Sequence, residues 1–113
     1  MGNKEIRIRC WVELDGKKFF GPGPARLLDL IDNEGSIAKA AKCMGMSYKK
    51  AWDIVTDLNT RGKEPYVISR KGGEKGGGAE LTAAGKLVMV KYRNLTQKLR
   101  SLVSEEEELL AHM

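Results

Sequence analysis

The 113-residue sequence is poor in the residues that most catalytic and metal sites need. It holds one histidine, His112, next to the last residue, and two cysteines, Cys10 and Cys43. Chain ends usually fray, so His112 has no rigid platform for nucleophile activation or general-base chemistry. Two cysteines are too few for a disulfide framework or a four-ligand zinc site. We therefore expect no enzyme activity, no metal and no cofactor.

Long apolar runs are also absent. No segment approaches the roughly 20 apolar residues of a membrane span. Residues 1–9 lack the apolar stretch of a signal peptide, so we expect a cytoplasmic protein with no membrane partner. The stretch 72–78, Gly-Gly-Glu-Lys-Gly-Gly-Gly, lacks the Gly-Lys-Ser/Thr ending of a P-loop, and it does not match the Gly-x-Gly-x-x-Gly that opens a nucleotide-binding helix. These patterns exclude the familiar phosphate-cradling loops.

Acidic residues are outnumbered by basic ones. Twenty Lys and Arg face 15 Asp and Glu, for a net charge of +5. Residues 105–108 are all glutamate, so residues 1–100 hold all 20 cations but 11 acids, a net charge of +9. Such a balance favours a polyanionic partner, nucleic acid or anionic lipid, although many basic domains bind neither.

The first 35 residues predict a β-hairpin followed by a helix. Five residues alternate with mostly charged ones and predict a half-buried strand over residues 4–14: Ile6, Ile8, Cys10, Val12 and Leu14. Asp15 and Gly16 suit a two-residue turn, after which residues 17–20 return antiparallel. The Gly-Pro-Gly-Pro of residues 21–24 breaks the strand, because proline suits the first turn of a helix. That helix runs from Pro24 to the closing Gly35.

Two short helices follow in close succession. Ser36 caps the first, which Gly45 ends, and Ser47 caps the second, which Gly62 closes. Only Met46 separates the end of one helix from the cap of the next. Helices joined this tightly cannot lie antiparallel, so they must cross steeply. This is the geometry of a helix-turn-helix, although a plain αα corner without a ligand shares it.

The outward face of the second helix favours the DNA-reading form. A step of about 100° per residue places Lys49, Asp53, Thr56 and Thr60 opposite the apolar stripe. A merely solvated face is the alternative, but hydroxyls and cations gather at the N-terminus, the end that a recognition helix inserts into the major groove. The predicted DNA-binding residues of the helix pair are Ser36, Ser47, Tyr48, Lys49, Lys50, Asp53 and Thr56.

A glycine-rich hairpin follows the helix pair. We expect a strand over residues 66–70, a flexible loop over 71–78 and a short return strand over 79–81. This pattern is typical of the wing in a winged helix-turn-helix. Arg70, Lys71 and Lys75 lie where a wing meets phosphate, and the small glycines permit close approach to a backbone. An idle hairpin tip is the alternative.

The last third predicts a long helix, capped by Thr82 and extending from 83 to about 110. Its heptad-like seam consists of Val88, Tyr92, Leu95, Leu99 and Leu102. Such a helix is too long for so small a core to cover, and an uncovered apolar stripe would form an exposed patch. We therefore expect a homodimer through this seam, the alternative being a helix that folds back on its own domain. The glutamates 105–108 oppose the helix dipole and should fray its end.

We accordingly predict a mainly helical α+β chain. Residues 1–81 form a winged helix-turn-helix DNA-binding domain with an N-terminal hairpin, and residues 82–113 form the dimerisation helix. The leading function is a sequence-specific regulator that binds double-stranded DNA. The alternative is a winged-helix architectural or protein-interaction dimer, which would bind DNA weakly and without salt dependence.

Several motifs resemble a known family. Residues 45–53 read Gly-Met-Ser-Tyr-Lys-Lys-Ala-Trp-Asp, residues 67–70 Val-Ile-Ser-Arg and residues 81–85 Leu-Thr-Ala-Ala-Gly, with glycines at 72–73 and 76–78. Together they resemble the N-terminal DNA-binding domain of the ModE family, the molybdate-responsive, LysR-like transcriptional regulators. The resemblance covers nearly the whole chain.

The resemblance implies a winged helix-turn-helix dimer that regulates molybdate transport or molybdenum-related genes. It places residues 47–50 at the start of the family's recognition helix and residues 71–78 in its wing. Sensing members carry a further molybdate-binding region after the long helix, and this chain ends at Met113. We expect an excised domain, a stand-alone regulator, or a subunit that relies on a separate molybdate-sensing partner.

Overall fold

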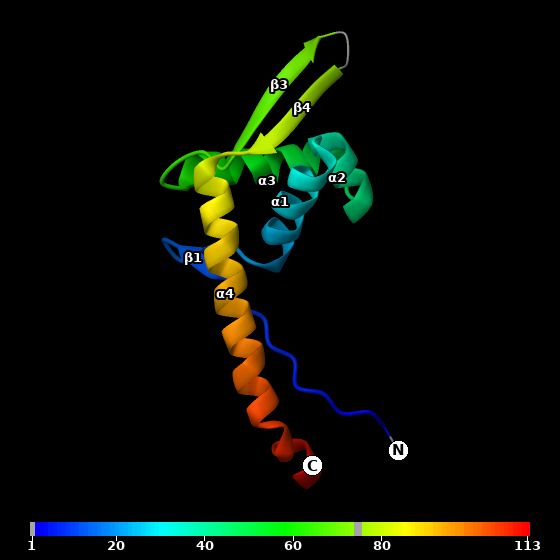
Figure 1. Ribbon diagram of the computed structural model, residues 1–113, viewed down its shortest axis with the longest axis vertical. Helices are drawn as coiled ribbons and strands as arrows, with labels where there is room; N and C mark the ends of the chain where they lie inside the picture. The colour runs from blue at the N-terminus through cyan, green and yellow to red at the C-terminus, as the bar shows by residue number, and fades with distance from the viewer. Residues whose placement is uncertain (1, 74–75) are drawn as a thin grey trace.

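The computed structural model describes residues 2–73 and 76–113 and shows an α+β fold, as predicted (Figure 1). Its elements in chain order are β1 (Val12–Leu14), β2 (Lys17–Phe20), α1 (Pro22–Glu34), α2 (Ile37–Met44), α3 (Tyr48–Arg61), β3 (Val67–Gly73), β4 (Gly76–Leu81), α4 (Ala83–Glu105) and the 3₁₀ helix η1 (Glu107–His112). The strands form two separate antiparallel pairs, β1 with β2 and β3 with β4. The pair β3–β4 extends from one end of the molecule and α4 from the other.

The core lies where α1, α2 and α3 meet. Leu27, Leu28 and Ile31 of α1 are fully buried, as is Leu58 of α3. Removing each such side chain from water contributes about 1.5 to 3 kcal/mol to folding. Met89 of α4 joins the same core. The first turns of the long helix are therefore part of the body that holds the helix-turn-helix.

Local sequence signals set the helix boundaries. The hydroxyls of Ser36, Ser47 and Thr82 accept hydrogen bonds from the backbone N–H groups three residues on, at 3.1, 3.1 and 3.0 Å. Gly35 and Gly45 end α1 and α2 with φ of 68° and 67°, a region that glycine enters without steric cost. The predicted caps, and with them the tight turn between α2 and α3, are confirmed.

The predicted strand over residues 4–14 is wrong for most of its length. Only Val12–Leu14 form β1, pairing Val12 with Phe20 and Leu14 with Lys17. The reason is the length of the partner, because β2 has four residues and α1 begins directly after Gly21. Residues 2–11 carry no assigned helix or strand. Alternation of apolar residues supplies a face for a strand but not a neighbour for its backbone.

Three other boundaries differ from the prediction. The helix α1 begins at Pro22, because proline lacks a backbone N–H and a first turn does not need one. The strands β3 and β4 reach Gly73 and Gly76, into the predicted loop, since glycine can still pair its backbone. The helix α4 ends at Glu105 and passes into η1, where the glutamates oppose the helix dipole. No helix among the described residues is long and apolar enough to cross a membrane.

Candidate DNA-binding site

The helix α3 buries one side and presents the other to solvent. Ala51, Val55 and Leu58 face the core, whereas Lys49, Asp53, Thr56 and Thr60 are exposed. The outward face is therefore the one that the sequence predicted. The N-terminal turn of α3 and its cap are exposed, and they carry the predicted hydroxyls of Ser47 and Tyr48 and the cations of Lys49 and Lys50.

The exposed face carries a charge pair that can open readily. Lys49 Nζ lies 3.1 Å from Asp53 Oδ2, one helical turn away, and both side chains are largely exposed. An exposed pair of this kind is worth about 0.3 to 0.5 kcal/mol. Lys49 can therefore exchange Asp53 for a base edge or a phosphate at little cost.

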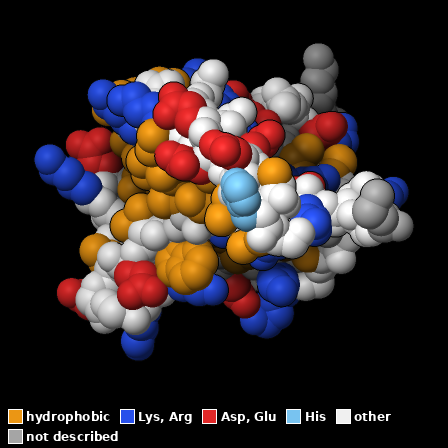
Figure 2. Space-filling model, turned by 90° about the horizontal axis from the view of Figure 1, so that it is seen from below, with side chains coloured by type: hydrophobic (Ala, Val, Ile, Leu, Met, Phe, Trp, Pro, Cys, Tyr) orange, Lys and Arg blue, Asp and Glu red, His pale blue; other side chains and the backbone are white. Residues whose placement is uncertain are grey.

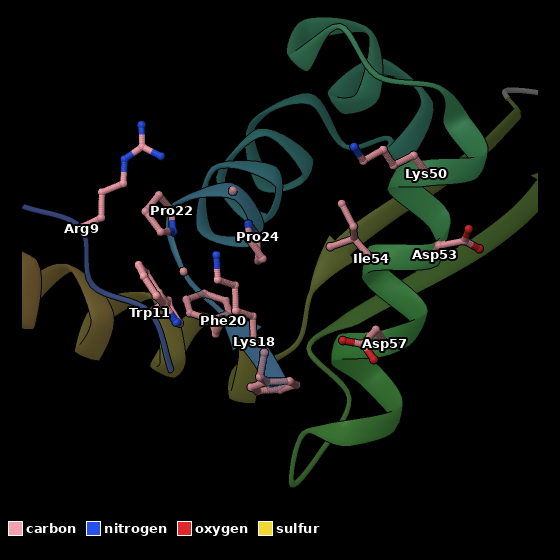
Figure 3. Close-up of a pocket in the computed structure, with 13 residues that line it drawn as sticks. Arg9, Trp11, Lys18, Phe20, Pro22, Pro24, Lys50, Asp53, Ile54 and Asp57 are labelled. Carbon is pink, nitrogen blue, oxygen red and sulfur yellow. The ribbon is translucent and has the colours of Figure 1, made fainter. Parts of the chain in front are cut away.

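A cleft of about 490 Å³ lies on one flank of α3, between this helix, the N-terminal segment and the start of α1 (Figure 3). Lys50 and Ile54 reach into it from α3, and Trp11 lies on the opposite wall. Lys18 places its Nζ 4.4 Å from the centre of the Trp11 ring, and Arg9 also lines the cleft. Asp53 and Asp57 line the cleft as well, so three cations and two carboxylates share it.

The other flank of α3 carries two aromatic side chains. Tyr48 and Trp52 stack with ring centres 6.2 Å apart and an interplanar angle of 24°. They remain 54% and 41% exposed. Tyr48 is among the DNA-binding residues predicted from the sequence, and Trp52 is not. Their spacing of four residues was the signal that could have predicted contact between them, because residues i and i+4 are neighbours on a helix surface.

A second residue that the sequence did not predict is Asn59, which fixes the wing to α3. Its Oδ1 accepts hydrogen bonds from the N–H groups of Tyr66 (2.8 Å) and Val67 (3.1 Å), and its Nδ2 donates to the carbonyl of Val67 (3.0 Å). The second wing strand is tied elsewhere, by the N–H of Ala79 donating to the carbonyl of Gly35 at 2.9 Å. The base of the wing thus has a defined position relative to the exposed face of α3.

The predicted phosphate contacts of the wing are placed only in part. Arg70 lies in β3 and pairs with Glu80 on β4, so its charge is shared within the wing. The backbone of Lys71 lies in β3, but its side chain is outside the described residues. Lys75 lies outside them altogether. Ser36 is half-buried and its hydroxyl caps α2, which leaves its DNA-binding role a prediction.

The predicted dimer seam on α4 divides into two parts. Val88 and Tyr92 are partly buried against the chain's own core, and the Tyr92 hydroxyl donates a 2.7 Å hydrogen bond to the carbonyl of Cys10. The pKa of Tyr92 is raised above its ordinary value. Burial is the largest cause and the charge of Cys10 adds to it, while Arg100 opposes the rise. Further along, Leu95 and Leu102 are 42% and 58% exposed and Leu99 is half-buried. The chain's own core therefore covers the first part of the seam and leaves the second part, Leu95 to Leu102, accessible to a partner.

Hydrophobic side chains form a broad patch in the view along α4, bordered by charged ones (Figure 2). A groove of about 380 Å³ runs between the N-terminal hairpin and this helix, lined almost wholly by apolar atoms. Its lining includes Val12, Leu87 and Leu95, which are all exposed. An apolar surface of this kind marks an interaction site more often than a surface of a monomer.

Comparison with known proteins finds homologues of the chain. No family model matches the sequence. The chain is 41% identical over 85 residues to the molybdenum transport protein ModE of Azotobacter vinelandii, covering 75% of this chain and 32% of that protein. It is 35% identical over 108 residues to the DNA-binding transcriptional dual regulator ModE of Escherichia coli K12, covering 93% and 41%. It is also 40% identical over 84 residues to the molybdenum-pterin-binding protein MopB of Rhodobacter capsulatus, covering 74% and 31%.

The chain spans about a third to two fifths of the length of these relatives. The similarity covers most of the chain, including α3 and the wing. The chain is therefore a homologue of the ModE transcriptional regulators, consistent with the N-terminal DNA-binding domain of that family.

Proposed function

We propose that the chain is a sequence-specific DNA-binding transcriptional regulator that controls molybdate transport or other molybdenum-related genes. The observation that carries the proposal is the exposed face of α3, a polar and cationic surface on the second helix of a helix-turn-helix. The relatives named as ModE regulators supply the link to molybdenum. In this proposal the chain acts in the cytoplasm on double-stranded DNA and performs no catalysis.

In the proposed complex the N-terminal turns of α3 enter the major groove. Lys49 and Tyr48 then meet base edges, and Lys50 meets a base edge or the adjacent phosphate. Asn59 holds the first wing strand beside the helix, so the wing lies over the neighbouring stretch of backbone. The net charge of +5 favours approach to DNA and makes the affinity fall with salt, because neutralised phosphates release counterions.

The test is selection of bound duplexes from a random DNA pool, followed by affinity measurements on the selected sequence. Lys49→Ala and Tyr48→Ala should each weaken specific binding by about 1 to 3 kcal/mol, or about 5- to 150-fold. Lys86→Ala is the matched control, since Lys86 is an exposed lysine on α4 and not on α3. Unchanged affinity and unchanged sequence preference in both α3 variants would exclude the proposed site.

The wing gives a second, separate expectation. Lys71 and Lys75 are predicted from the sequence to meet phosphate and not base edges. Replacing both with alanine should weaken binding to the selected and to random duplexes almost equally, and should flatten the salt slope by about one to two units. If the double variant instead changed the preferred base at one position, the wing would read sequence. Weak binding without salt dependence would favour the architectural or protein-interaction alternative.

A further inference from the structure

Among the described residues, the stacked pair of Tyr48 and Trp52 has no structural role that accounts for its position. Both rings are about half exposed, on a helix whose buried side is already filled by Ala51, Val55 and Leu58. Neither ring takes part in the hydrophobic core formed by the described residues. An aromatic ring left in water forgoes the stabilisation that burial would give it. A partner that covers the rings would recover that free energy.

The pair lies on the flank of α3 that also carries Asn59. A step of about 100° per residue puts Tyr48, Trp52 and Asn59 on one stripe of the helix, and Asn59 holds the first strand of the wing. Lys50 and Ile54 lie on the opposite flank, at the cleft beside the N-terminal hairpin. The two rings therefore lie on the same stripe of α3 as the residue that holds the wing, next to the exposed Lys49 and Asp53.

The surroundings of the pair favour DNA over an apolar protein surface. Lys49 lies on the outward face beside the two aromatic residues, and its charge is only loosely held by Asp53. A partner that covers the rings must also accept this cation. The major groove offers both chemistries, since base edges and phosphates bind cations while thymine presents the groove's one apolar group, its 5-methyl.

We propose that Trp52, supported by Tyr48, packs against the 5-methyl group of a thymine in the major groove and gives α3 a preference for thymine at that position. The inference rests on the proposed DNA-binding function and adds a specificity-determining residue to it. Stacking on Tyr48 limits the motion of the Trp52 ring, so less side-chain entropy is lost when the ring meets the methyl group.

The test replaces thymine by uracil, which removes only the methyl group. The probe is the duplex that the wild-type chain selects from a random pool, with each thymine exchanged for uracil in turn. At the contacted position uracil should weaken wild-type binding about fourfold, the loss expected for one buried methyl group. Trp52→Ala should bind the thymine and uracil forms equally there, and Trp52→Phe should retain part of the difference.

Lys49→Ala is the matched control, because it should weaken binding while leaving the thymine-to-uracil ratio unchanged. Trp52 is exposed, so its alanine variant should unfold at the wild-type temperature, which a melting curve checks. A selected duplex whose binding is insensitive to uracil at every thymine overturns the inference alone. So does a thymine-to-uracil ratio that persists in Trp52→Ala. A pool that yields no preferred sequence overturns the proposed function and the inference with it.

Discussion

At the scale of single residues, Gly85 shows how closely the long helix approaches the base of the wing. A Cβ at this position would lie 2.3 Å from the carbonyl oxygen of Tyr66, which is a backbone atom that cannot turn aside. The N–H of Gly85 also donates to Thr82, so the residue is fixed at the start of α4. Glycine here permits the contact between α4 and the strand that begins the wing.

We predict that Gly85→Ala lowers the free energy of unfolding by about 1 to 3 kcal/mol, because the added methyl group forces the helix and the backbone apart. The measurement is urea unfolding followed by circular dichroism. Gly23→Ala is the matched control, since Gly23 also lies in a helix but its Cβ would meet nothing within 4 Å. That variant should be neutral or slightly stabilised. Equal stability of the two variants would contradict the close contact.

The sequence predicted single residues well where their roles are local. Ser36, Ser47 and Thr82 cap helices as expected, because a cap bonds to a backbone group three residues on. Residues whose roles depend on distant segments were not predicted. Asn59 bonds to residues seven and eight positions later, and Gly85 meets Tyr66 only after the wing has folded back. Nothing in their immediate neighbourhood signals these contacts.

At the scale of elements, the position of the wing depends on Asn59. Its side chain satisfies the N–H groups of Tyr66 and Val67 and the carbonyl of Val67, just where β3 begins. Both residues are buried, so their backbone groups have poor access to water. Leaving a buried N–H without an acceptor costs about 1 to 3 kcal/mol.

We expect Asn59→Ala to lower the free energy of unfolding by about 1 to 3 kcal/mol and to speed amide exchange at Val67. DNA binding should weaken further than stability alone explains, because the wing loses its fixed angle to α3. Hydrogen exchange and duplex affinity measure the two effects. Asn94→Ala provides the control, since Asn94 is exposed on α4. Wild-type exchange at Val67 in the Asn59 variant would contradict the role of this side chain.

Elements differed in how far the sequence determined them. The sequence predicted α2 and α3 because each helix has a capping serine, a closing glycine and an apolar stripe. All three signals lie within the helix or next to it. A strand also needs a partner, and the alternation over residues 4–14 could not supply one. With β2 only four residues long, the pairing extends no further back than Val12. The need for a partner strand also explains the wing. Its glycine-rich segments have little strand propensity, but they pair because the residues before and after them already pair β3 with β4.

At the scale of the whole molecule, the chain is elongated. Its Cα radius of gyration is 17.0 Å, against about 13 Å for a compact chain of this length, and it extends 60 Å along its longest axis. The second half of α4 and the wing account for this shape, because they leave the body that contains the core at opposite ends (Figure 1). The exposed Leu95 and Leu102 lie on that half. A monomer would leave this apolar surface in water.

We predict a two-fold homodimer in which the open part of the α4 seam and the adjoining apolar groove meet a second copy. Such a dimer presents two α3 helices, so the selected DNA should be a pseudo-palindrome with half-sites about one helical turn, or a multiple of it, apart. The sequence could predict the seam from its spacing. It could not predict that Val88 and Tyr92 would be taken up by the chain's own core, since that depends on where the N-terminal hairpin packs.

Replacing Leu95 and Leu102 with glutamate should give a folded monomer, because both side chains are exposed in the single chain and charge there is costly only at an interface. Affinity for the palindrome should fall by about 100-fold or more as the joint two-site contact is lost, while affinity for an isolated half-site should be unchanged. Sedimentation over a concentration series measures the assembly, with Lys98→Glu as the control for added charge on α4. A wild-type chain that stays monomeric throughout, with the same profile as the double variant, would show that α4 serves its own domain alone.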